Sequence, residues 1–316
     1  MILVTGSTGF IGNALIRRLA ELGEKNLRAC SRKSDAIFPV GINSVLIESV
    51  SNTTDWQDAL KQVDVVIHTV ARVHRLNDKS KNPLSAFRET NVDATINLAK
   101  QAVSAGVKRF VFISSVKVNG ESTSDKAFTA FDIPAPLDPY GISKHEAEQG
   151  LLAFAKDTGL EVVIIRPPLV YGPNVRANFL RLMRLMKWGV PLPFSAIDNR
   201  RSMVAIDNLV DLLITCTVHP SAAGQIFMVS DECDVSTPGL LHMIADSMGK
   251  KSILFPVPAS ILAGTAAFVG KSGEANRLLN SLQVDIAHTK STLGWQPVVN
   301  LQESIRTTVE HFLKFQ

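Results

Sequence analysis

Short apolar runs alternate with amphipathic stretches through the first half of the chain. The runs are rich in valine and isoleucine, which favour strands, and they cover residues 2–5, 27–31, 64–71, 109–114 and 161–166. Because they are apolar throughout instead of alternating with polar residues, they predict parallel strands with helices on both sides. The pattern therefore predicts an α/β fold of the Rossmann type, with a doubly wound parallel sheet.

The stretch after the first apolar run predicts an amphipathic helix. Ile11, Leu15, Leu19 and Leu22 lie on one stripe of it, and Gly23 is a suitable C-terminal cap. This helix would pack its apolar stripe against the sheet.

Beyond residue 167 the pattern becomes irregular and prolines accumulate. Residues 208–218 then predict a helix and residues 225–230 a further strand, so the chain should return to the sheet once. We expect a Rossmann domain that binds a dinucleotide and a smaller C-terminal α/β domain that binds the substrate. The first comprises residues 1–167 plus 204–230, and the second comprises residues 168–203 plus 231–316.

Composition excludes several classes of partner. The net charge of +4 comes from scattered lysines and arginines without a dense basic run, so we expect no nucleic-acid binding. Cys30, Cys216 and Cys233 are far apart and outside metal-ligand spacing, which indicates reduced thiols of a cytoplasmic protein and no metal site. The first residues resemble a strand and not a signal peptide.

The longest apolar tract spans residues 253–269. Prolines 256 and 258 interrupt it, and it is too short for a membrane span. We expect a core or interface helix there and no membrane insertion.

Three glycines lie between the first strand and the first helix. Gly6, Gly9 and Gly12 are spaced for a tight turn, in which the backbone can approach a pyrophosphate at the helix N-terminus. A tight turn without a ligand is the alternative, but the position after a strand and before a helix favours dinucleotide binding.

The end of the second strand bears on the choice of cofactor. Arg32 follows Ser31 where an acidic residue would normally bind the ribose of NAD, and a cation there suits the additional phosphate of NADP. We therefore favour NADP(H). Asp35 keeps NAD(H) open, and Arg32 could also be a solvated loop residue.

Tyr140 and Lys144 are spaced as i and i+4, which places them on one face of a helix. A cation near a phenol lowers its pKa, so Lys144 is expected to favour the phenolate of Tyr140 for proton exchange. Ser114 and Ser115 end a strand at the edge where ligands bind in parallel sheets. Hydride transfer to a ketone builds alkoxide character, which a proton donor and a hydroxyl would stabilise.

The order of these motifs resembles the extended short-chain dehydrogenase/reductase family, especially its nucleotide-sugar epimerase, dehydratase and reductase branch. The resemblance covers nearly the whole chain. It rests on Gly6-x-x-Gly9-x-x-Gly12, His68-Thr69-Val70-Ala71, Asn91-Val92-x-x-Thr95, Ser114-Ser115, Tyr140-x-x-x-Lys144, Arg166-Pro167, Tyr171-Gly172-Pro173 and Leu293-Gly294-Trp295-x-Pro297.

The resemblance implies a role for each matching residue. Tyr140 would exchange a proton with a sugar oxygen, Ser115 would hydrogen-bond that oxygen, and Lys144 would hold the cofactor ribose. For the substrate, it implies a UDP-sugar whose diphosphate contacts Asn178 and Arg201, with Arg277 as a further candidate. The residues expected to bind the cofactor are Gly6, Thr8, Gly9, Phe10, Ile11, Gly12, Ser31, Arg32, Ala71, Asn91, Ser114, Tyr140 and Lys144.

Two positions after Ser115 separate branches of the family. Sugar dehydratases of this family typically have Asp and Glu there, whereas this chain has Val116 and Lys117, which argues against water elimination. Lys117 could contact the substrate, or it could be a surface or supporting lysine. Asn119 stands where the family commonly has tyrosine.

The segments 71–74 and 112–121 resemble reductases that act on a UDP-linked 4-keto-6-deoxy-N-acetylhexosamine in bacterial surface-polysaccharide synthesis. With Arg32, this favours an NAD(P)H-dependent reductase. A UDP-hexose or UDP-N-acetylhexosamine 4-epimerase with tightly bound NAD is the alternative. A non-catalytic dinucleotide-binding regulator is more remote, since Tyr140 and Lys144 are both present. The resemblance also suggests a homodimer through residues 83–105 and the helix that carries Tyr140.

Overall fold

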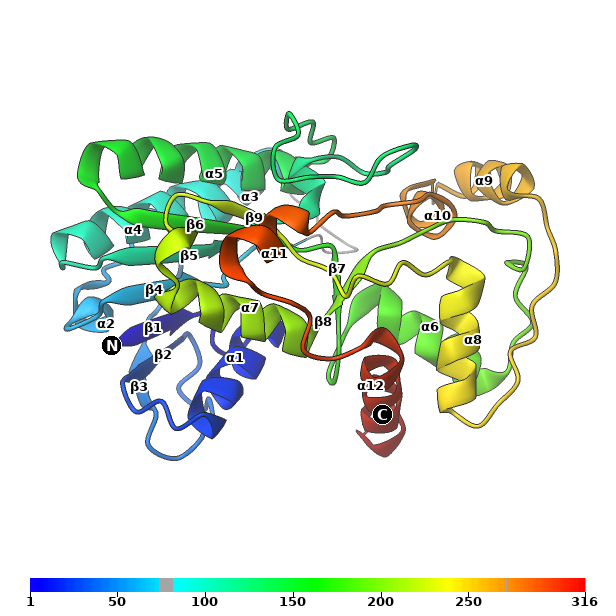
Figure 1. The fold of residues 1–316 in the computed structure, drawn as a ribbon, viewed down its shortest axis with the longest axis horizontal. Helices are drawn as coiled ribbons and strands as arrows, with labels where there is room; N and C mark the ends of the chain where they lie inside the picture. The colour runs from blue at the N-terminus through cyan, green and yellow to red at the C-terminus, as the bar shows by residue number, and fades with distance from the viewer. Residues whose placement is uncertain (74–81, 271, 316) are drawn as a thin grey trace.

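The computed structural model describes residues 1–73, 82–270 and 272–315, so His74 lies outside the described part. Within those ranges, seven strands form one parallel sheet with helices on both faces, which confirms the predicted Rossmann-type α/β fold (Figure 1). Across the sheet the strands are β3 (Asn43–Leu46), β2 (Leu27–Ser31), β1 (Ile2–Thr5), β4 (Val65–His68), β5 (Arg109–Ile113), β6 (Glu161–Arg166) and β9 (Ile226–Met228).

Apolar side chains project from both faces of the sheet, as successive strand residues must. In β5, Val111 joins the buried cluster on one face, while Phe110 and Phe112 join the cluster on the other. The first face is covered by α1 (Phe10–Glu21), α7 (Ile206–Val218) and α11 (Ala287–Leu293). The second is covered by α2 (Gln57–Leu60), α3 (Pro83–Arg88), the π-helical turn η1 (Glu89–Asp93), α4 (Ala94–Ser104) and α5 (Pro139–Thr158).

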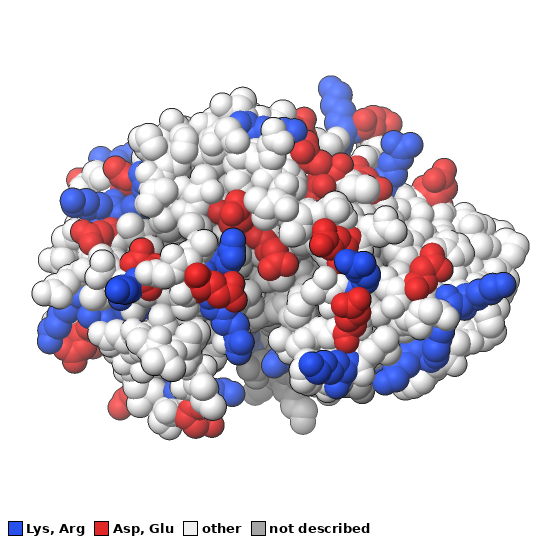
Figure 2. Space-filling model, turned by 60° about the horizontal axis from the view of Figure 1, so that its bottom comes forward, with Lys and Arg blue, Asp and Glu red and all other residues white. Residues whose placement is uncertain are grey.

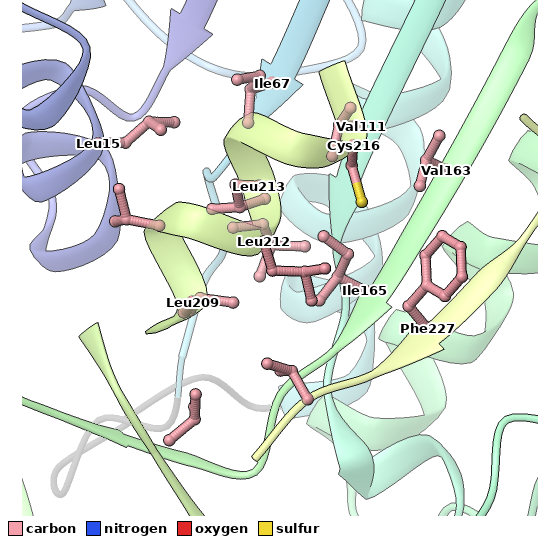
Figure 3. Close-up of a cluster of buried hydrophobic side chains, with 14 of the residues drawn as sticks. Leu15, Ile67, Val111, Val163, Ile165, Leu209, Leu212, Leu213, Cys216 and Phe227 are labelled. Atoms are coloured by element: carbon pink, nitrogen blue, oxygen red, sulfur yellow. The ribbon is translucent and has the colours of Figure 1, made fainter. Parts of the chain in front are cut away.

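The predicted return of the chain to the sheet is present as α7 and β9. Helix α7 buries Leu209, Leu213 and Cys216. These side chains point toward the sheet, where Ile165 of β6 and Phe227 of β9 belong to the same buried cluster (Figure 3). Full burial of an apolar side chain such as leucine stabilises a fold by about 2 kcal/mol. The packing of α7 therefore helps to hold β9 at the edge of the sheet.

The irregular stretch after residue 167 builds a second layer around its own buried cluster, which includes Phe179, Leu241 and Ile305. The predicted division into two domains, with boundaries at residues 167, 203 and 230, stays a prediction. The layer consists of the parallel pair β7 (Leu169–Tyr171) and β8 (Met203–Ala205) with α6 (Ala177–Trp188), α8 (Thr237–Ser247), α9 (Ala259–Phe268), α10 (Ser272–Leu279) and α12 (Leu301–Phe315). Short 3-10 turns are η2 (Val116–Val118) and η3 (Pro220–Ala222).

One helix differs from its prediction. The tract of residues 253–269 contains α9, which lies at one end of the molecule and has no buried residue (Figure 1). Of the two predicted alternatives, the core helix is wrong, because the second layer completes its core with α6, α8 and α12 and leaves α9 outside. The interface helix stays a prediction.

Candidate active site

The glycine turn is shaped by close backbone approach. Gly6 has φ +72°, and a Cβ added at Gly12 would lie 2.3 Å from the Gly6 carbonyl oxygen. The amide of Gly9 donates to the same carbonyl oxygen at 2.8 Å. Gly9 caps α1 without a side-chain hydrogen bond, so the amides of the first helical turn point to a site that suits an anion.

The end of β2 places the two residues predicted to select the cofactor. Ser31 is buried, and its hydroxyl accepts a hydrogen bond from the amide of Lys33 at 2.9 Å. Arg32 is exposed. Its guanidinium can therefore reach a ligand or remain in solvent, and its predicted role stays a prediction.

Asn91 lies in the π-helical turn η1 and joins two parts of the site. Its side-chain oxygen accepts from the amide of Arg72 at 2.7 Å, and its side-chain nitrogen donates to the hydroxyl of Ser143 at 2.9 Å. Asn91 thus fixes the loop after Ala71 against α5, one residue from Lys144. These hydrogen bonds give Asn91 a positioning role. Its predicted contact with the cofactor stays a prediction.

The two serines that end β5 differ in their surroundings. Ser115 caps η2, and its hydroxyl accepts from the amide of Lys117 at 3.2 Å. Ser114 is buried, and its hydroxyl has no hydrogen-bond partner among the described residues. Both hydroxyls therefore retain capacity for a further hydrogen bond at the carboxyl edge of the sheet.

Tyr140 lies in the first turn of α5, next to Ser115. Burial raises the pKa of Tyr140 to about 12, and the charge of Asp138 adds to this rise, whereas a hydrogen bond with Ser115 opposes it. The expectation that Lys144 lowers this pKa is wrong for this structure, because burial raises the pKa and only the hydrogen bond with Ser115 opposes the rise. Without further positive charge nearby, Tyr140 holds its proton at neutral pH.

Lys144 is fully buried on the same face of α5. Its ammonium lies 3.9 Å from the ring centroid of Phe112 and has no hydrogen-bond partner within the described ranges. Burial lowers the pKa of Lys144 to about 7, and the charge of Glu148 opposes this effect. A buried ammonium without a hydrogen-bonded partner is costly, which fits a site completed by ligand oxygens. The free amides of α1 and this lysine together fit a nicotinamide dinucleotide.

Lys117 is mostly buried and faces two carboxylates. Its ammonium pairs with Asp138 and, at 2.8 Å, with Glu121. Asp138 also caps α5 by accepting from the amide of Gly141 at 2.7 Å. Lys117 thus ties η2, with Ser115, to the start of the helix that carries Tyr140, and its predicted contact with the substrate stays a prediction. Sequence reasoning missed Asp138, although Asp-Pro before a helix is a recognisable start signal.

A buried ion pair joins α5 to strand β6. The guanidinium of Arg166 donates to Glu148 at 2.6 Å and to the side-chain oxygen of Asn119 at 3.1 Å, and both members of the ion pair are 2% exposed. Asn119, which departs from the tyrosine of the family pattern, therefore completes a network between β6, α5 and the residues after η2. Glu148 was also missed; its spacing of four from Lys144 was the available signal.

The three residues predicted to hold a diphosphate line one pocket in the second layer. Asn178 comes from α6, Arg277 from α10, and Arg201 from the segment before β8. Burial lowers the pKa of Arg201 and the charge of Arg277 lowers it further, while Glu121 opposes both. Two guanidiniums that repel each other across a pocket suit an anionic ligand. Glu121 also connects this pocket to Lys117.

Within residues 1–73, 82–270 and 272–315, no three His, Cys, Asp or Glu side chains are grouped as metal ligands would be. No helix of that part of the chain is long and apolar enough to cross a bilayer.

Residues 2–230 match the model of the NAD dependent epimerase/dehydratase family. The chain belongs to this family. The match includes the glycine turn, Ser115, Tyr140 and Lys144. The chain is therefore an NAD-dependent enzyme of the epimerase/dehydratase family, and the regulator hypothesis is set aside. The family supports NAD(H), whereas the preference for NADP(H) finds no support.

Two relatives of this chain are 4-epimerases. UDP-glucose 4-epimerase of Vibrio cholerae is 48% identical, over 99% of this chain and 95% of that protein. An N-acetyl-alpha-D-glucosaminyl-diphospho-ditrans,octacis-undecaprenol 4-epimerase of Escherichia coli O157:H7 is 26% identical, over 83% of this chain and 77% of that protein.

Solved structures of family members have the same fold. MoeE5 in complex with UDP-glucuronic acid and NAD is 27% identical, with a TM-score of 0.80 over 100% of this chain and 99% of that protein. UDP-glucuronic acid 4-epimerase from Bacillus cereus in complex with NAD has a TM-score of 0.80 at 20% identity, over 99% of this chain and 98% of that protein.

Proposed function

We propose that this enzyme is a 4-epimerase of a UDP-linked hexose or N-acetylhexosamine that uses tightly bound NAD. The similarity along almost the whole chain to the Vibrio cholerae UDP-glucose 4-epimerase is the observation that carries the proposal. The complex of MoeE5 with UDP-glucuronic acid and NAD supports the same classes of substrate and cofactor.

The proposed chemistry inverts one hydroxyl-bearing carbon of the sugar. Bound NAD supplies a reversible hydride acceptor at the sugar carbon. Tyr140 would take and return the proton of the sugar oxygen, and Ser115 would donate a hydrogen bond to that oxygen. Lys144 would bind the cofactor ribose. The amides at the start of α1 would hold the pyrophosphate of the cofactor.

The substrate would be held through its diphosphate. Arg201 and Arg277 would neutralise it from two sides, and Asn178 would add an amide hydrogen bond. This leaves the sugar near Lys117 and Tyr140, since Glu121 interacts with both Lys117 and Arg201. Val116 and Lys117 stand where sugar dehydratases typically have Asp and Glu, which argues against a dehydratase.

A reductase of a UDP-linked 4-keto-6-deoxy-N-acetylhexosamine is the second candidate. The exposed Arg32 at the end of β2 favours it, because a reductase commonly takes NADPH from solution. Three free thiols, of which Cys30 and Cys216 are buried, support a cytoplasmic enzyme under either proposal. The homodimer through residues 83–105 and α5 stays a prediction.

The two candidates differ in their use of cofactor. An epimerase should convert UDP-glucose or UDP-N-acetylglucosamine to the 4-epimer without added nucleotide, and mass spectrometry should find NAD in the purified protein. If the protein is purified without NAD, forms no epimer and oxidises NADPH with the 4-keto sugar, the epimerase proposal is wrong.

A further inference from the structure

Helix α9 belongs to a surface segment without charge. Residues 252–270 contain no Asp, Glu, Lys, Arg or His. Ile261 is 55% exposed and Phe268 is 92% exposed, and no residue of α9 is buried. A helix without a polar face is expected inside a protein core or in contact with lipid. The exposed apolar side chains of α9 therefore indicate a surface that another molecule covers.

The apolar surface continues beyond α9. Trp188 ends α6, and Val190 comes shortly after it. The backbone of Leu192 pairs with Ile253 and Phe255 through hydrogen bonds. Leu192 itself is buried, whereas the side chains of Trp188, Val190, Ile253 and Phe255 are exposed. Together they form what we name the apolar end of the molecule: Trp188, Val190, Ile253, Phe255, Ile261, Phe268 and Val269.

Positive charge lies beside the apolar end. Lys250 and Lys251 directly precede the uncharged segment, and the Lys250 ammonium donates to the carbonyl of Lys187 at the end of α6. Asp246 is the nearest preceding carboxylate in the sequence. In Figure 2 the right-hand end of the molecule is largely uncharged, and Lys and Arg side chains gather along its lower border.

The nature of the surface favours lipid over protein as the occupant. Helix α9 packs against α10, and its exposed residues include Ile261 and Phe268. Lysines at the border and an exposed tryptophan are the features that bind anionic headgroups and the bilayer interface. We propose that the apolar end docks on the surface of a membrane that contains anionic lipids.

This docking would place the substrate pocket next to the membrane. Helix α9 packs against α10, which carries Arg277. The Rossmann sheet would lie on the side away from the lipid (Figure 1). Since none of the described helices can span a bilayer, the contact is peripheral.

Flotation with vesicles tests the proposal. The full chain should float with vesicles of phosphatidylcholine and phosphatidylglycerol, and bind pure phosphatidylcholine more weakly. Ile261→Asp with Phe268→Asp should lower the partition coefficient at least about tenfold. Lys250→Gln and Lys251→Gln should each weaken binding to the anionic vesicles about fivefold.

A matched control and a second readout make the result specific. Ile37 and Val40 are 88% and 104% exposed in a loop of the Rossmann part, so Ile37→Asp with Val40→Asp should leave vesicle binding unchanged. Trp56 and Trp295 are buried, so a blue shift of tryptophan fluorescence on vesicle addition, absent in Trp188→Phe, would report Trp188.

Three results would overturn the proposal. The parent protein could fail to float with anionic vesicles, or both pairs of Asp substitutions could weaken binding equally. The Ile261 and Phe268 pair could instead convert a dimer to a monomer in sedimentation velocity without any change in vesicle binding. That last result would assign the apolar end to a second copy of the chain.

Discussion

In the proposed reaction Tyr140 exchanges a proton, although its surroundings favour the neutral phenol. Burial and Asp138 raise the pKa of Tyr140 to about 12, and only Ser115 opposes them. Lys144 and the positive charge of oxidised nicotinamide are the two cations that the proposed complex would set against this rise. Proton transfer at Tyr140 therefore depends on the assembled site.

Replacement of Tyr140 by Phe should lower kcat about 10³-fold, because a positioned proton carrier contributes about 10² to 10⁴. NAD binding should stay within about twofold, since the ring still packs at the edge of Phe87. Ser115→Ala, which keeps the proton carrier, should cost less. Steady-state kinetics and fluorescence titration of NAD would check both variants; a Tyr140→Phe enzyme with full turnover would rule out the role.

The buried ammonium of Lys144 predicts how stability depends on pH. Its pKa falls from 10.5 in the unfolded chain to about 7 in the fold. Between these values the unfolded chain binds the additional proton, so the free energy of unfolding should rise with pH across this window.

Urea unfolding of nucleotide-free protein at pH 7.5 and 9.5 would measure this effect against Lys144→Met, which has no titrating group. The parent should gain about 2 kcal/mol over the variant between the two pH values, since one pKa unit corresponds to about 1.4 kcal/mol. Equal gains in both proteins would mean that Lys144 is not desolvated as the structure shows.

At the scale of elements, the position of α5 decides the geometry of the site. Asp138 caps its first turn, and the ion pair of Glu148 with Arg166 anchors its middle to β6. A side-chain cap stabilises a helix by about 1 kcal/mol, while removal of one partner from a buried ion pair costs about 3–5 kcal/mol. The helix thus holds Tyr140 and Lys144 at two fixed points.

Asp138 has two effects that substitution can separate. Asp138→Asn keeps a capping side chain but removes the negative charge, so the apparent pKa of Tyr140 in the pH profile of kcat/KM should fall by roughly half a unit or more. Asp138→Ala should show the same shift and lose about 1 kcal/mol of stability. If Asp138→Asn leaves the profile in place, the charge of Asp138 does not act on Tyr140.

The strands and α5 were predictable because their determinants are local. Valine-rich runs, the glycine spacing and the four-residue step from Tyr140 to Lys144 each involve only a few neighbouring residues.

The pKa of Tyr140 was not predictable, because it depends on burial by elements distant in sequence. The exposure of α9 depends likewise on which helices complete the second core. The convergence of Asn178, Arg201 and Arg277 on one pocket was anticipated only through the family resemblance.

At the scale of the whole molecule, the two layers meet along the carboxyl edge of the sheet. The Rossmann part contributes the glycine turn, Ser115 and Tyr140, and the second layer contributes the pocket with Arg201 and Arg277. Lys117 and Glu121 lie between them and connect the proton-transfer residues to the proposed diphosphate site. Under the proposed function, this arrangement would let a single chain hold a dinucleotide and a nucleotide sugar at once.

The fate of the hydrogen on C4 of the sugar tests epimerisation most directly. The substrates are UDP-glucose and UDP-N-acetylglucosamine deuterated at C4. We expect the 4-epimer of at least one of them to form with the deuterium still on C4, because the same hydride returns. NMR and mass spectrometry of the products would measure it. Epimer that has exchanged its deuterium with solvent, or no epimer from either substrate, would contradict the account.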